Sequence, residues 1–296
     1  MTSSRSNSLI EDATLNDIAG IEAPVIDSHA HIFSRDNPVA PDAWTRLDYE
    51  FTADDYLATL DRHGVFFGVL SALSISGYYN DFTLAALRRH KRLRSTVILP
   101  PDTDRYTMER MRNDGVVGIR LQLTRRQELP DFTTEEFQLL LRRVRDLGWH
   151  VQVTLEGPLL PPLLAVLEPT GVNIVIDHFG HPDPKVGVAC KGFQAMMRSA
   201  AKGRTWIKLS GGFRLAGTDS WRSDPNSNTD ALTGELARML LAEVGPDRLL
   251  WGSDCPFVGY ERRISYAQTL RDFYRWVPDP GLRRRISDTA LRLYFS

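Results

Sequence analysis

Short apolar runs alternate along most of the chain with longer segments in which apolar residues recur every three or four positions. The short runs carry few polar residues, which is typical of strands that are covered on both faces. They predict eight strands, at residues 24–29, 65–73, 94–100, 116–123, 149–157, 172–180, 205–211 and 248–254.

The segments between these runs predict helices, because their apolar residues share one helical face and several of the segments end in Gly. The predicted helices cover residues 52–64, 81–92, 104–115, 133–148, 158–171, 191–203, 230–245 and 261–277. A last helix, at 280–295, is expected to pack on the outside of the domain.

About eight strand–helix units in about 270 residues is the scale of an α/β protein with a single-domain (β/α)8 TIM barrel, which we predict for residues 21–296. A doubly wound open sheet is the alternative, and it usually carries a Gly-rich loop after its first strand. The sequence DSHAHIF, at 27–33, occupies that place and favours the barrel. Residues 1–20 are predicted to form a flexible N-terminal tail.

Composition narrows the class of protein further. The 36 basic and 37 acidic residues of the 296-residue chain nearly cancel, which argues against a general nucleic-acid binder. No apolar stretch is long enough to span a bilayer, and the N-terminus lacks the apolar core of a signal peptide. Two cysteines, Cys190 and Cys255, do not make a disulfide framework. We therefore predict a cytoplasmic protein without nucleic-acid or membrane partners.

Polar side chains gather at the ends of the predicted strands, where TIM barrels carry their chemistry. His29 and His31 follow the first strand and share a face, because alternate residues of a strand point the same way. His178 follows the sixth strand and Asp254 the eighth. Each has a simpler interpretation: His178 could be a hydrogen-bonded core histidine, and Asp254 could cap a turn. Their convergence at one mouth favours catalysis.

Arginines fall at the same end of the predicted barrel. Arg120 ends the fourth strand in apolar surroundings and needs an anionic partner, either a structural carboxylate or a substrate. Arg125 and Arg126 follow it in the loop, where one of them is expected to be a solvated surface charge, and Arg214 follows the seventh strand. The sequence thus predicts a cationic pocket beside the imidazoles.

The segments DSHAHIF, GIRLQL, IVIDHFGHP, KLSG and LLWGSDCPF, in this order, resemble the amidohydrolase superfamily over roughly residues 22–296. They are most similar to its lactonase branch, the group that contains 2-pyrone-4,6-dicarboxylate lactonase. The resemblance implies an enzyme of aromatic compound catabolism that opens a carboxylate-bearing, 2-pyrone-4,6-dicarboxylate-like lactone by water attack on the carbonyl. The implied catalytic residues are Asp254, His29, His31 and His178. The implied substrate-binding residues are Arg120, Arg126 and Arg214. Thr154, which stands where the family has a tyrosine, and Tyr49 and Ser76 from loops at the same end are further candidates.

In this hypothesis the arginines bind the substrate carboxylates, the histidines donate N–H groups to the carbonyl oxygen, and Asp254 takes a proton from water. We expect no cofactor, because no bridging metal ligand is evident in strands four and five and the arginines repel cations. The alternative is one divalent metal, zinc, on His29, His31, His178 and Asp254.

Other functions stay open at this point. The chain could hydrolyse a different lactone, such as sulfomuconolactone or a sugar-acid lactone, or it could be a metal-dependent decarboxylase of aromatic acids from the same superfamily. A binding protein on an inactive barrel is disfavoured by the joint presence of the three histidines and Asp254. The expected partner is a small anionic lactone, and the expected assembly is a monomer or small homo-oligomer.

Overall fold

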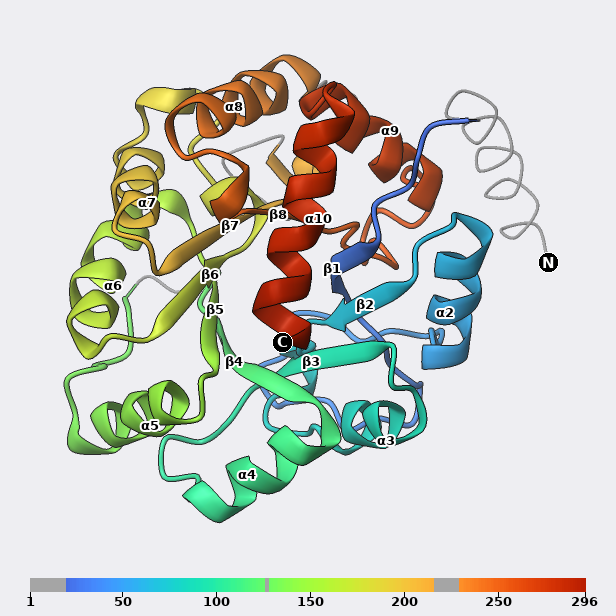
Figure 1. The fold of residues 1–296 in the computed structure, drawn as a ribbon. Coiled ribbons are helices and arrows are strands. Elements are labelled where there is room, and N and C mark those ends of the chain that lie inside the picture. The colour runs from blue at the N-terminus through green and yellow to red at the C-terminus, as the bar shows by residue number, and fades with distance from the viewer. Residues whose placement is uncertain (1–19, 126–127, 216–228) are drawn as a thin grey trace.

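Eight parallel strands form one sheet in chain order in the computed structural model, which describes residues 20–125, 128–215 and 229–296 (Figure 1). The strands are β1 Ile26–Ala30, β2 Phe67–Leu70, β3 Leu93–Val97, β4 Val116–Gln122, β5 His150–Thr154, β6 Asn173–Ile176, β7 Thr205–Leu209 and β8 Leu249–Trp251. Each lies within or overlaps one of the predicted runs. The sheet curls into the predicted TIM barrel, so the prediction of the fold class is confirmed.

The barrel closes between β8 and β1, just beyond the regular hydrogen bonds of the sheet. The backbone N–H of Asp254 donates to the carbonyl oxygen of His29 at 2.7 Å, and that of His31 donates to the carbonyl of Cys255 at 2.7 Å. The first and last strands are therefore joined at the residues that the sequence marks as candidates for catalysis.

A ring of helices surrounds the sheet (Figure 1). They are α2 Ala53–Arg62, α3 Asp81–Arg89, α4 Arg105–Asp114, α5 Glu135–Asp146, α6 Leu160–Leu167, α7 Lys191–Ala201, α8 Asp230–Glu243 and α9 Tyr266–Trp276. Local sequence sets their ends: Thr52 and Asp55 form a capping box at the start of α2, and Gly115, with a φ of 119°, ends α4. Their buried faces pack against the outer face of the sheet and form the main apolar core.

The last helix, α10 Pro280–Phe295, lies across one end of the barrel rather than beside the outer ring (Figure 1). Ala290 and Tyr294 pack with Ile26, Val175 and Leu250 in a second apolar cluster. Ile26 begins β1, so α10 closes the end at which the strands start. The apolar face of α10 thus plugs the bottom of the barrel, a placement that periodicity alone does not distinguish from packing on the side.

The opposite end, where the strands finish, carries the candidate site. Residues 1–19 of the predicted tail lie outside the described part of the chain. Within 20–125, 128–215 and 229–296, the helices are all too short or too polar to cross a membrane.

Candidate active site

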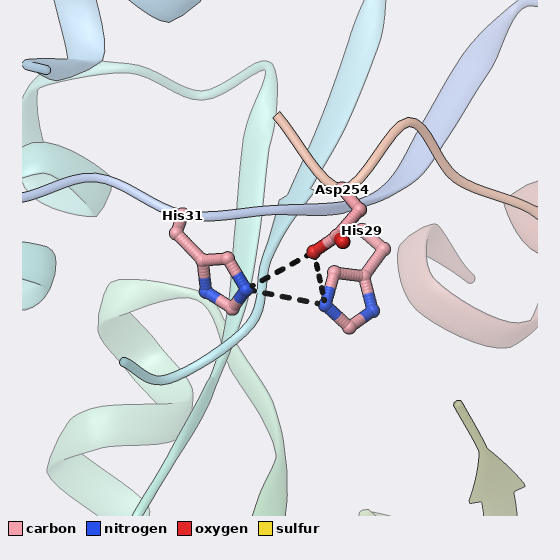
Figure 2. Close-up of side chains that lie close together, drawn as sticks. All are labelled: His29, His31 and Asp254. Carbon is pink, nitrogen blue, oxygen red and sulfur yellow. Dashed lines mark hydrogen bonds and ion pairs between the residues drawn. The ribbon is translucent and has the colours of Figure 1, made fainter. Parts of the chain in front are cut away.

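Three polar side chains from the two ends of the chain meet at the barrel mouth, as Figure 2 shows. His29 comes from β1, His31 from the residue just after it, and Asp254 from the loop after β8; all three are buried. The Nε2 atoms of His29 and His31 lie 3.3 Å apart. Oδ1 of Asp254 lies 3.6 Å from Nε2 of His29 and 3.5 Å from Nε2 of His31. The three atoms therefore form a nearly equilateral triangle.

The backbone around this triangle is unusual. Asp254 and His178 both have left-handed backbone conformations, with φ of 66° and 50°. Such conformations disfavour residues with a Cβ and cluster at functional sites. Two glycines make room: a Cβ on Gly252 would lie 2.5 Å from Cβ of His29, and one on Gly211 would lie 2.5 Å from Nδ1 of His178. The glycines in WGSD and LSGG therefore let the strands bring these histidines close.

The hydrogen bond of His31 fixes which of its nitrogens carries a proton. Its Nδ1 lies 2.8 Å from the carbonyl oxygen of Ser71, which can only accept a hydrogen bond. Nδ1 is therefore protonated, and in the neutral ring Nε2 presents a lone pair to His29 and Asp254. Nδ1 of His29 lies 3.2 Å from Oδ1 of Asp177 and 3.2 Å from Nζ of Lys208. When Nδ1 donates to the carboxylate, Nε2 of His29 presents a second lone pair to the triangle.

Asp177, just after β6, forms ion pairs and hydrogen bonds with several buried side chains of the site. Arg120 approaches Asp177 with Nη2 at 3.1 Å from Oδ2, and Lys208 with Nζ at 3.3 Å from Oδ1. Gln152 donates to both carboxylate oxygens at 2.9 and 2.8 Å, and the hydroxyl of Thr154 donates to Oδ2. Two cations thus share one buried carboxylate, so this part of the mouth favours anionic ligands.

Burial and charge set the protonation of the site. Burial lowers the pKa of His29 to about 3 and also lowers the pKa values of His31 and His178, so all three rings are neutral at pH 7. Burial is the largest influence on the pKa of Asp254 and would raise it, but the Arg214 guanidinium, whose Nε donates to Oδ2, acts with the neighbouring histidines to hold this pKa well below its usual range. Asp254 is therefore an ionised carboxylate beside neutral imidazoles.

A pocket opens from the triangle to the surface. It is lined by His31, Trp44, Leu73, Ser74, Ile75, Arg120, Gln122, Thr154, His178, Arg214, Asp254 and Val258. His29 lies beneath this lining, with its ring centroid 4.6 Å from that of His178. Nδ1 of His178 pairs with the hydroxyl of Ser210 at 2.9 Å.

Two of the predicted substrate-binding residues have other placements. Among the described residues, Tyr49 and Ser76 do not line this pocket. Instead, the Tyr49 hydroxyl donates to Oε1 of Glu261 at 2.8 Å, and Ser76 belongs to a short 3-10 turn, η1 Ser74–Ser76, whose first residue does line the pocket. Arg126 lies outside the described residues. The roles of these three stay predictions.

Sequence reasoning gave no role to Asp177 or Lys208, although both have a place in the site. Asp177 directly precedes His178 in IVIDHFGHP, and Lys208 is an inward-facing cation in the otherwise apolar run TWIKL. A charge inside a buried strand needs a partner of opposite sign, and that rule could have paired Lys208 with Asp177 across β6 and β7.

The triangle fits a divalent metal ion. Tetrahedral zinc with ligands at about 2.0–2.1 Å separates its ligand atoms by about 3.3–3.4 Å, close to the three distances between His29, His31 and Asp254. Two imidazole lone pairs and a carboxylate oxygen converge there, an arrangement that a cation stabilises. A second donor group, His29, Asp177 and His178, also exists, but Asp177 already accepts from several donors. The first group is the better fit.

The family described as amidohydrolase matches residues 26–295. A 4-sulfomuconolactone hydrolase of Rhizobium radiobacter is 30% identical over 275 residues, which cover 90% of this chain and 89% of that protein. A 2-pyrone-4,6-dicarboxylate hydrolase of Comamonas testosteroni is 27% identical over 93% of this chain and 91% of its own. Among solved structures, a probable 2-pyrone-4,6-dicarboxylic acid hydrolase of Acinetobacter baumannii with bound citric acid has a TM-score of 0.84 at 28% identity, over 92% of this chain and 99% of that one.

The prediction that no metal is required is wrong. An amidohydrolase of Burkholderia multivorans with bound zinc shares the fold at a TM-score of 0.75 and 20% identity, over 92% of this chain and 99% of its own, and the donor triangle described above suits such an ion. Repulsion by the arginines does not keep a cation away, because both arginines are paired with carboxylates: Arg214 with Oδ2 of Asp254, and Arg120 with Asp177, which Lys208 shares. The predicted alternative of four ligands is narrowed to three of them, His29, His31 and Asp254.

The predicted resemblance and the prediction of a hydrolase are both confirmed by these relatives. The match runs through all eight strands and includes every described residue of the site from His29 to Asp254. The chain belongs to the amidohydrolase family.

Proposed function

We propose that this protein hydrolyses a carboxylate-bearing lactone, with 2-pyrone-4,6-dicarboxylate and 4-sulfomuconolactone as the first candidates. The names of the relatives support a lactone. The observation that carries the proposal is that Arg120 and Arg214 line the same pocket as His178 and the ionised Asp254. That combination places anion-binding groups beside a base and a donor for a carbonyl oxygen.

Substrate binding relies on charge. Arg120 and Arg214 are both buried, and guanidinium groups form bidentate, charge-assisted hydrogen bonds with carboxylates and sulfonates. Because Arg120 and Lys208 share Asp177, an anionic substituent near Arg120 completes the charge balance. The lactone ring is thereby fixed with its carbonyl carbon close to Asp254.

Ring opening needs a proton acceptor and a donor to the carbonyl oxygen. Asp254 accepts a proton from the attacking water as the new C–O bond forms. His178, positioned by Ser210, donates from Nε2 to the carbonyl oxygen as negative charge develops on it. When the ring C–O bond breaks, Asp254 passes its proton to the departing ring oxygen, which yields a carboxylic acid and an enol or alcohol. A divalent metal held by His29, His31 and Asp254 supplies Lewis-acid polarisation of an oxygen when bound.

The setting that we propose is the cytoplasm and the breakdown of aromatic compounds, in a monomer or small homo-oligomer. Two observations support it. The chain has two cysteines, Cys190 and Cys255, and both are buried, which is unlike the disulfide framework of a secreted protein. The relatives are named as hydrolases of 4-sulfomuconolactone and of 2-pyrone-4,6-dicarboxylate.

A panel of substrates tests the proposal. Purified protein loaded with zinc is incubated with 2-pyrone-4,6-dicarboxylate, 4-sulfomuconolactone, a sugar-acid lactone and an aromatic carboxylic acid. Acid release is followed in a pH-stat and carbon dioxide by gas analysis. The proposal expects acid release from one or both of the first two compounds. Carbon dioxide release from the aromatic acid without lactone hydrolysis would instead establish a decarboxylase.

A further inference from the structure

The lining of the pocket is of two kinds. The histidines, arginines and Asp254 described above are its charged and polar part. Trp44, Leu73 and Ile75 form an apolar wall, which is continuous because the Trp44 indole is hydrogen-bonded to Ser74, between the other two residues. A ligand that meets both parts carries anionic groups and also presents an apolar surface.

Trp44 is the largest side chain of the apolar wall, and several loops hold it. It comes from the long segment between β1 and α2, and its indole Nε1 donates to the hydroxyl of Ser74, after β2, at 3.4 Å. The guanidinium carbon of Arg125, from the loop after β4, lies 4.4 Å from the centre of the Trp44 ring and covers one of its faces.

Arg125 is itself fixed in place. Its backbone N–H donates to Oε1 of Glu156, which follows β5, at 3.0 Å. Segments after β1, β2 and β4 therefore meet at one aromatic ring, and the segment after β5 supports the backbone of Arg125. Because this ring is held before any ligand arrives, little conformational entropy is lost when a ligand stacks against it.

We propose that Trp44 is a specificity-determining residue that selects flat, unsaturated ring substrates over saturated lactones. This inference rests on the proposed function for the reaction that the substrate undergoes. The preference in binding rests on the pocket lining alone. A planar conjugated ring whose carboxylates pair with Arg120 and Arg214 offers its face to the apolar wall, and aromatic stacking favours it over a puckered ring. A pyrone has this shape, and a sugar-acid lactone, with its puckered ring and hydroxyl groups, does not.

The test uses two probes that cannot be hydrolysed and differ only in the ring: benzene-1,3-dicarboxylate and cis-cyclohexane-1,3-dicarboxylate. Both place two carboxylates at the same ring positions. Isothermal titration calorimetry on the full-length protein should show that the aromatic probe binds about 3- to 10-fold more tightly. Trp44→Leu, which keeps an apolar side chain, should abolish this preference, and Trp44→Phe should keep most of it.

Trp206 provides a matched control. It is a tryptophan of β7 that also lies under a guanidinium, with the guanidinium carbon of Arg248 4.9 Å from its ring centre, but it packs with the cluster at the closed end of the barrel. Trp206→Leu should leave the preference unchanged.

Equal affinities of the wild-type protein for the two probes, binding of neither probe, or an undiminished preference in Trp44→Leu would each overturn the inference. If the preference holds and disappears in Trp44→Leu while none of the lactones in the panel is hydrolysed, the role of Trp44 stands and the proposed reaction fails.

Discussion

The two ends of this barrel are built from the same eight strands in opposite ways. At the end where the strands begin, α10 closes the barrel with an apolar cluster that includes Ile26, Ala290 and Tyr294. At the end where they finish, charged groups such as Asp177 and Asp254 are buried beside cations, and several residues, His178 and Asp254 among them, adopt left-handed backbone conformations. Apolar packing at the closed end thus stabilises the fold, whereas the buried charges and the strained backbone at the mouth destabilise it.

This comparison assigns different consequences to substitutions at the two ends. Changes at the mouth should alter turnover or binding and leave much of the stability intact. Changes at the closed end should alter stability and leave turnover per folded molecule intact. Four substitutions, ordered by the size of the expected effect, test this division.

The largest effect is expected at the mouth. Asp254→Asn removes the proton acceptor but keeps the size of the side chain, so kcat for lactone hydrolysis should fall about 1,000-fold, equal to about 4 kcal/mol of activation free energy. The aromatic probe should still bind through Arg120. Steady-state kinetics measure the first effect and calorimetry the second. Asp36→Asn, in an exposed loop after β1, is the control and should change neither. Near-normal turnover in Asp254→Asn would remove Asp254 from the mechanism.

At the closed end, Tyr294→Ala empties the space that the ring fills between α10 and the barrel. Tyr294 is 2% exposed, and comparable truncations of large aromatic residues lower the free energy of unfolding by about 3–5 kcal/mol. Urea denaturation measures the loss. At 25 °C, kcat/KM per folded molecule should stay within about 2-fold of the wild type. A large fall in kcat/KM in the variant would show that the two ends are not independent.

His150, whose ring contacts that of Tyr294, makes the closed end sensitive to acid. Burial, and then the charge of Lys208, lower the pKa of His150 to about 3 from about 6.5. Between these values the unfolded chain binds the proton and the folded chain does not, so the free energy of unfolding falls as the pH drops from about 6.5 towards 3.

In His150→Phe this contribution is absent. Between pH 7.5 and 5, the wild type should lose about 2 kcal/mol more stability than the variant. Urea titrations at both pH values give the difference. Parallel losses in the two proteins would mean that His150 is protonated in the folded state as readily as in the unfolded chain.

The smallest effect concerns one hydroxyl. The Tyr294 hydroxyl is buried and has no hydrogen-bond partner among the described residues. Tyr294→Phe removes this unsatisfied group and should raise the free energy of unfolding by about 1 kcal/mol, with unchanged kinetics. A loss of stability in thermal or urea denaturation would indicate that the hydroxyl is satisfied in solution.

The sequence predicted the strands well because strands depend on short-range patterns. Apolar runs mark buried parallel strands, and His29, His31, His178 and Asp254 stand at strand ends, which a barrel brings together. The structure places the first two histidines and Asp254 in one triangle and lines the pocket with Arg120, Arg214 and Thr154.

What the sequence did not reveal depends on contacts between distant segments. The pairing of Asp177 with both Arg120 and Lys208 depends on how β4, β6 and β7 meet inside the closed barrel, and the position of Trp44 depends on a long loop without periodicity. The prediction that no metal is required was wrong for the same reason. Which carboxylate each arginine or lysine pairs with depends on the three-dimensional structure. The placement of α10 likewise depends on which apolar surface the barrel leaves open.

The most direct test of the central claim is a crystal structure of Asp254→Asn in complex with 2-pyrone-4,6-dicarboxylate. The account predicts that the substrate carboxylates bind the guanidinium groups of Arg120 and Arg214, that the lactone carbonyl oxygen faces His178, and that the carbonyl carbon lies beside the substituted side chain. A substrate bound outside the barrel mouth, or bound with its carbonyl turned away from His178 and position 254, would contradict it.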